Sequence, residues 1–140
     1  MRIIFVFITL LSLFSCDYSD NRLIFHNLSN DTLFVNYNVK NEIITSFKPN
    51  YYRDIRFHRY WQEGCLLPKE QESLQIINKS WEDFITTIPD GKIRIIIFKK
   101  QLLDTTKWDR IVKEQISSKI IERDVEDLKI LNWIVEYDGK

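Results

Sequence analysis

Residues 92–98, Lys-Ile-Arg-Ile-Ile-Ile-Phe, constrain the fold of this chain more than any other segment. Four of these seven residues are β-branched isoleucines, and the turn-forming tripeptide Pro-Asp-Gly stands immediately before them. An apolar run between turn signals is typical of a strand in the middle of a sheet. Because side chains alternate along a strand, Ile93, Ile95 and Ile97 are expected to share one face.

The segments before residue 80 favour further strands. Residues 22–27 and 32–39 are rich in apolar side chains, and the polar residues 28–31 between them favour a turn, which predicts an antiparallel hairpin. The second of these strands has a polar face, interrupted by Phe34, and an apolar face. The apolar face consists of Leu33, Val35, Tyr37 and Val39. Additional strands are expected at 42–47, 51–57, 73–77 and 132–137, with a loop over 58–71.

Helix signals lie in the second half of the chain. Ser80 is placed to cap a helix over 81–87, with Asp83 at its third position. Asp124 is placed to cap a short helix whose apolar residues, Leu128, Ile130 and Leu131, face inward. Between them, apolar residues at helical spacing predict a helix over 107–115, capped by Asp104 or Thr105. That helix would bury Trp108, Ile111 and Val112.

The predicted strands come mostly before the predicted helices along the chain. This order indicates an α+β domain rather than a regular alternating parallel sheet. We therefore expect a mainly antiparallel sheet or sandwich-like β domain with two or three short helices in the C-terminal half. Trp81, Trp108 and Trp133 each lie beside an apolar stripe and are expected in the core.

The first sixteen residues have the pattern of a secretion signal. Arg2 precedes an apolar run over 3–14, which is shorter than the ~20 residues that a membrane-spanning helix needs. The tetrapeptide Leu-Phe-Ser-Cys ending at Cys16 resembles a bacterial lipobox, in which the cysteine thiol takes the lipid (diacylglycerol, then palmitate). The expected division is a signal peptide over 1–15, lipidated Cys16 and a tether over 16–21, and one domain over 22–140. An ordinary signal peptide with a coincidental cysteine is the alternative.

Composition excludes some classes of function. Twenty basic and twenty acidic residues balance, so no general electrostatic field attracts nucleic acid. With Cys16 lipidated, Cys65 has no second cysteine for an intramolecular disulfide, and stability must come from packing of the 44% hydrophobic residues. A chain of this length supports one core.

Several later motifs stand together in a recognisable order. They are Trp-Asp-Arg-Ile at 108–111, Glu-Asp-Leu at 126–128 and Leu-Asn-Trp at 131–133, after a lipobox and an N-terminal hairpin pattern. In this the chain resembles a group of small uncharacterised lipoproteins of Bacteroidota. The resemblance implies a location in the cell envelope, a fold and a bacterial phylum. It carries over no activity and no functional residue.

The best candidate for a binding surface is an aromatic and basic segment, because tyrosine, tryptophan and arginine anchor many interfaces. Its members are Tyr51, Tyr52, Arg53, Arg56, Arg59, Tyr60 and Trp61. Alternatively the rings of this segment pack in the core while the arginines reach solvent.

The residues that catalysis or metal binding would require do not form a recognisable pattern. His58 and Cys65 lack the third orienting residue of a nucleophilic site, and the two histidines, His26 and His58, lack zinc-ligand spacing. The acidic residues over 122–127 lack a calcium-loop pattern and are better explained as a solvated helix start. We therefore expect no catalytic residues, cofactor or metal.

These observations favour a non-enzymatic binding or assembly module, lipid-anchored in the cell envelope at the outer membrane. The expected partner, besides the membrane, is an envelope protein or glycan. A small hydrolase with a site assembled from scattered residues, or a lipoprotein that protects its own cell from a toxin, are the alternatives. The sequence leaves open the membrane face and the oligomeric state.

Overall fold

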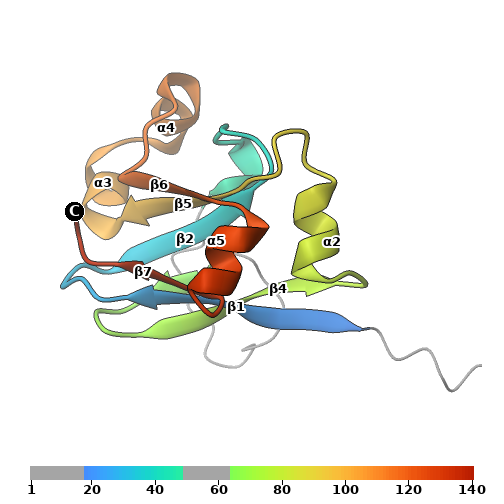
Figure 1. Ribbon diagram of the computed structural model, residues 1–140. Helices are drawn as coiled ribbons and strands as arrows, with labels where there is room; N and C mark the ends of the chain where they lie inside the picture. The colour runs from blue at the N-terminus through green and yellow to red at the C-terminus, as the bar shows by residue number, and fades with distance from the viewer. Residues whose placement is uncertain (1–17, 49–63) are drawn as a thin grey trace, which may run out of the picture.

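The computed structural model describes residues 18–48 and 64–140 (Figure 1). Within these ranges it contains seven strands, one short 3-10 helix and four α-helices. The strands are β1 (Ser19–Asn27), β2 (Leu33–Asn38), β3 (Gly64–Leu66), β4 (Gln71–Ile77), β5 (Ile93–Lys99), β6 (Lys119–Arg123) and β7 (Ile134–Tyr137). The helices are η2 (Thr45–Phe47, 3-10), α2 (Trp81–Thr86), α3 (Lys100–Thr105), α4 (Trp108–Glu114) and α5 (Val125–Ile130).

The strands form two sheets. In sheet A, of order β4-β1-β7, β1 pairs antiparallel with β4 and parallel with β7, and sheet B, of order β3-β2-β5-β6, is antiparallel throughout. All four α-helices follow β4 in the chain. The expected mainly antiparallel α+β class, with short helices in the C-terminal half, is confirmed; the described residues hold four α-helices where two or three were expected.

Strand β5 is buried on both faces. Ile93, Ile95 and Ile97 point into the main core, which they share with Leu23 and Phe25 of sheet A. The central position predicted for 92–98 is therefore confirmed, since β2 and β6 flank β5. Helices α2 and α5 complete this core with Trp81, Ile85 and Leu128.

The opposite face of sheet B carries a second, smaller core. Ile96 and Phe98 of β5 pack there with Phe34 of β2 and Ile111 of α4. In Figure 1, sheet A lies below sheet B, α4 lies above sheet B, and α3 lies at the left, beside the end of β5. The second core covers the face of β2 that carries Phe34, so this face is not solvated. This explains why an apolar side chain interrupts the otherwise polar face of β2. The expected apolar face of β2 meets the main core.

The predicted hairpin between the first two strands is wrong. Strands β1 and β2 belong to different sheets, and the polar residues between them form a corner. Asn27, fully buried, holds this corner: its Nδ2 donates to the carbonyl oxygens of Asp31 (2.8 Å) and Leu67 (3.0 Å), while its Oδ1 accepts from the Ser29 hydroxyl (2.6 Å). A polar turn signal marks a reversal of the chain, but not whether the flanking strands pair.

Residues 42–47 do not form the expected strand; only the 3-10 helix η2 lies there. Ile43 instead enters the second core, and its main chain is held by Gln115, whose Oε1 accepts from the Ile43 N–H at 2.6 Å and whose Nε2 donates to its carbonyl at 3.0 Å. Strand β3 lies in the expected loop, and β6 and α3 were not predicted. The strand expected at 51–57 lies outside the described residues.

Two of the three predicted helix starts are confirmed. The Asp83 N–H donates to Ser80 Oγ (3.0 Å), and the Asp127 N–H donates to Asp124 Oδ1 (2.8 Å). The predicted cap of α4 is wrong, because Lys107 occupies that position without a side-chain hydrogen bond. Asp104 is instead paired with Lys100 on α3.

The burial predicted for α4 and α5 is only partly correct. Ile111 of α4 is fully buried, whereas Trp108 and Val112 are half-buried against the second core. Leu128 of α5 is fully buried, but Ile130 and Leu131, which were also expected to point inward, are 78% and 41% exposed.

Candidate functional site

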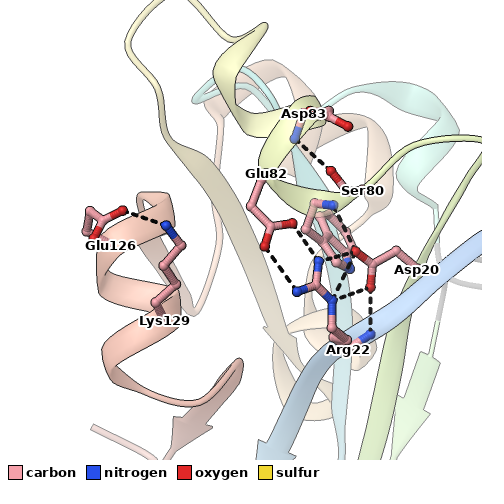
Figure 2. A network of polar contacts seen from close by, with 8 residues as sticks. Asp20, Arg22, Ser80, Glu82, Asp83, Glu126 and Lys129 are labelled. Atoms are coloured by element: carbon pink, nitrogen blue, oxygen red, sulfur yellow. Dashed lines mark hydrogen bonds and ion pairs between the residues drawn. The ribbon is translucent and has the colours of Figure 1, made fainter.

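A connected group of charged residues lies near the start of β1 (Figure 2). The Arg22 guanidinium contacts two carboxylates: its Nη2 lies 2.6 Å from Asp20 Oδ2 and 2.5 Å from Glu82 Oε2. Asp20 is on β1 and Glu82 is on α2, 60 residues from Arg22 in the chain. We call these three residues the Arg22 cluster. It joins sheet A to α2.

Asp20 is the buried member of the cluster, with 1% of its side chain exposed, whereas the Arg22 side chain is 45% exposed. A shift of strand register between Asp20 and Leu23 turns Asp20 toward the interior. There its Oδ2 accepts a hydrogen bond from the main-chain N–H of Trp81 at 3.0 Å. The first residue of α2 is thereby tied to β1.

Hydrogen bonding sets the electrostatics of the cluster. The bond from Arg22 lowers the pKa of Asp20 to about 2 against the opposing effect of burial, and it lowers the pKa of Glu82 as well. Both carboxylates, chiefly Asp20, raise the pKa of Arg22 further above its ordinary value. The three groups remain ionised at neutral pH. A general acid or base needs a pKa near the working pH, so this arrangement suits a structural joint better than proton transfer.

The cluster also reaches the turn between α5 and β7. The Arg22 guanidinium carbon lies 4.5 Å from the centre of the Trp133 ring, a cation–π distance. Trp133 has a positive φ of 62° and follows Asn132, whose φ is 52°. The Trp133 N–H donates to the Leu128 carbonyl (2.7 Å), closing the end of α5. A tryptophan in this conformation is costly, on the order of 1–3 kcal/mol, so its packing and the Arg22 contact must hold it there.

Trp81 lies at the centre of the neighbouring aromatic group. It is fully buried, with its ring edge-on to Tyr37 at 5.3 Å and to Phe84 at 6.0 Å between centroids. Its indole N–H has no hydrogen-bond partner in the part of the chain that the structure describes. Of the three tryptophans expected in the core, Trp81 is fully enclosed, whereas Trp108 and Trp133 are half-buried at core margins.

Two other charged groups fasten sheet B. Arg94 of β5 pairs with Asp90 and with Glu122 of β6 (3.1 Å), and its Nη1 donates to the Val39 carbonyl. Lys99 Nζ lies 2.9 Å from Asp31 Oδ2, and this carboxylate raises the pKa of Lys99. Each group links segments that are distant in sequence.

The acidic residues over 122–127 have similar structural roles. Glu122 pairs with Arg94, Asp124 caps α5, and Glu126 pairs with Lys129 (2.9 Å; Figure 2). Among residues 18–48 and 64–140, no three histidine, cysteine, aspartate or glutamate side chains form a group able to hold a metal ion.

The structure describes only some of the residues singled out from the sequence. Cys16, His58 and all seven members of the expected binding surface (Tyr51, Tyr52, Arg53, Arg56, Arg59, Tyr60 and Trp61) lie outside the described residues. Cys65 is half-buried on β3, opposite Phe34, and packs against the second core. His26 lies on the outer face of β1, with its Nδ1 3.8 Å from Glu136 Oε1.

Sequence reasoning missed the Arg22 cluster because it assigned Asp20 to the tether. Strand β1 starts at Ser19, before the expected domain start at residue 22. If side chains alternated regularly from Leu23 toward the N-terminus, Asn21 and not Asp20 would lie on the inner face of β1. The register shift between Asp20 and Leu23 instead brings Asp20 to the inner face. The available signal was the closely spaced Asp20 and Arg22.

Comparison with protein-family models, with curated proteins and with solved structures finds no match to this chain. None of the described helices has the length and apolar character needed to cross a membrane. The family resemblance and the function therefore remain proposals.

We predict that Asp20→Asn lowers stability at neutral pH and flattens its dependence on acid. The pKa of Asp20 falls from 3.8 when unfolded to about 2 when folded, so its carboxylate contributes about 2 kcal/mol above pH 3.8. That contribution is lost as the pH falls through about 2. Glu82 and Asp90 also have lowered pKa values, so the variant retains part of the dependence. Urea unfolding between pH 2 and pH 6 measures both effects. Parallel stability curves for the two proteins would contradict the assignment.

Proposed function

We propose that this chain is a cell-envelope lipoprotein, anchored in the outer membrane by acyl chains on Cys16, that acts as a non-enzymatic binding or assembly module. The observation that carries the proposal joins sequence and fold. Strand β1 begins at Ser19, three residues after Cys16. A folded domain that starts directly after a lipobox-like motif has the organisation of a tethered soluble domain. The resemblance to Bacteroidota lipoproteins supports the same location in the cell envelope.

The charged groups support a non-enzymatic role. The Arg22 cluster, the Arg94 group and the Lys99 group each use their charges to connect strands or helices. The pKa values of Asp20 and Asp90 are lowered, which means that their surroundings stabilise the ionised carboxylates. Acid–base catalysis favours the opposite kind of shift.

A binding role is supported by the surface at the turn between α5 and β7. Three aliphatic side chains are exposed there: Ile130 by 78%, Leu131 by 41% and Ile134 by 37%. They adjoin Trp133, which stacks with Arg22. Tryptophan and arginine beside exposed apolar side chains are typical of protein interfaces. Aliphatic side chains offer little to a sugar, so we favour an envelope protein over a glycan as the partner.

Cys16→Ala tests the anchor. The variant should incorporate no fatty acid and should be released from the membrane or remain unprocessed, because the thiol that takes the lipid is gone. Metabolic labelling with palmitate and fractionation of the envelope measure this. The matched control is Cys65→Ser, which should label like the parent. Equal labelling of Cys16→Ala and the parent would contradict the proposal.

Ile130→Ser with Ile134→Ser tests the binding surface. Both side chains are partly exposed, so the double variant should unfold within about 1 kcal/mol of the parent. In intact cells it should lose adducts that the parent forms with a short amine-reactive crosslinker. The control is Leu67→Ser, which removes an exposed leucine (43%) elsewhere on the surface, with an exposure close to that of Ile134. Unchanged adducts in the double variant would place the interface elsewhere.

A further inference from the structure

The distance between the lipid site and the fold limits how the domain meets the membrane. Three residue steps separate Cys16 from Ser19, the first residue of β1. A fully extended chain covers at most ~3.6 Å per residue, so Ser19 lies within about 11 Å of the Cys16 backbone. An acylated cysteine holds its own backbone at the headgroup layer. The first residues of β1 are therefore held next to the lipid surface.

The end of the β1–β4 pair lies at this point. Ser19 is the register partner of Ile77, the last residue of β4, and the Asn78 N–H donates to the Tyr18 carbonyl at 2.7 Å. In Figure 1 this end projects beside the base of α2, at the right of the molecule. It carries two of the exposed large hydrophobic side chains, Tyr18 (58% exposed) and Ile77 (52%). Because paired residues share a face, Tyr18 and Ile77 point to opposite sides of the sheet.

These side chains suit a lipid surface. Tyrosine is enriched where membrane meets water, because its ring is apolar and its hydroxyl is polar. The nearby charges of Asp20, Arg22 and Glu82 are paired with one another, while Lys79 beside Ile77 is exposed. The end of the strand pair thus presents two apolar side chains and a lysine, with no unpaired acid from the Arg22 cluster.

We propose that Tyr18 and Ile77, with Asn78 and Lys79, form the membrane-facing end of the domain and enter the headgroup layer of the bilayer. This inference rests on the proposed lipidation of Cys16. It also places the binding surface. Ile134 pairs with Ile24, five residues along β1 from Ser19, or about 17 Å at ~3.3 Å per residue. With β1 directed away from the bilayer, as this proposal has it, the turn between α5 and β7 lies clear of the lipid surface and open to an aqueous partner.

The test places a fluorescent thiol probe at Ile77→Cys in the full chain carrying Cys65→Ser. The matched control carries the probe at Leu67→Cys, an exposed apolar position before the opposite end of β4. Each protein is purified from membranes, its acyl mass is confirmed, and it is reconstituted in phosphatidylethanolamine–phosphatidylglycerol vesicles. The vesicles contain lipid with a nitroxide near the top of the acyl chain, which quenches the probe at short range.

The proposal expects quenching at position 77 to be several-fold stronger than at position 67. Equal quenching at both positions would overturn it, because the domain would then lie along the membrane. Acylated protein with no quenching at 77 would also overturn it while leaving the lipoprotein proposal intact. Protein without acyl chains would overturn both proposals. Melting curves matching the Cys65→Ser parent show that the probe positions are folded.

Discussion

The burial of β5 on both faces is the constraint on which the rest of the structure depends. All residues from Ile93 to Phe98 are buried, so this strand needs an apolar layer above and below it. Sheet A supplies one layer, with α2 and α5 closing its margin, and α3 and α4 supply the other. A single solvated sheet would leave Ile96 and Phe98 in water. At about 1.5–3 kcal/mol for each large apolar side chain, that exposure would outweigh most single polar contacts.

The polar groups then position the peripheral segments around this layered core. Asn27 turns the chain from sheet A to sheet B, and Gln115 holds the main chain at Ile43, which lies outside the strands of the described residues. The Arg22 cluster fastens the start of β1 to α2 and to the turn after α5. Because the proposed lipid site lies three residues before β1, this joint connects the anchor to the body of the domain. Firm attachment there would fix the orientation of the domain on a membrane.

Local signals in the sequence predicted local structure well. The apolar run of β5 and the caps Ser80 and Asp124 depend on neighbouring residues, and the structure contains all three. The pairing of strands that are distant in the sequence could not be predicted from neighbouring residues. The polar turn after Asn27 fits a hairpin and a corner equally, and β6 carries too few apolar residues to be recognised without its partner β5.

The site residues likewise depend on features of the folded chain that neighbouring residues do not reveal. Asp20 was hidden because a register shift in β1 inverts the alternation that sequence reasoning relies on. Ile130 and Leu131 were both expected inward. Ile130 lies two residues after the buried Leu128 and therefore points to the other side of α5, whereas Leu131 lies in the turn after the helix. The contact between Arg22 and Trp133 joins the two ends of the described chain and has no signal in either segment. The exposed side chains proposed here as binding surfaces are therefore visible only in the folded chain.

The most direct test of this account is the stability of Ile96→Ala, since Ile96, like Phe98, is a β5 residue that packs in the second core and not in the main core. If both faces of β5 are packed, the substitution should lower the free energy of unfolding by about 2–5 kcal/mol, as for a buried isoleucine in any core. Ile97→Ala, on the main-core face, should cost a similar amount, and Ile130→Ala, at a 78% exposed position, should change it little. Urea unfolding of the three variants gives the comparison. A cost for Ile96→Ala no larger than that for Ile130→Ala would show that the second face of β5 is not packed, contradicting the layered structure.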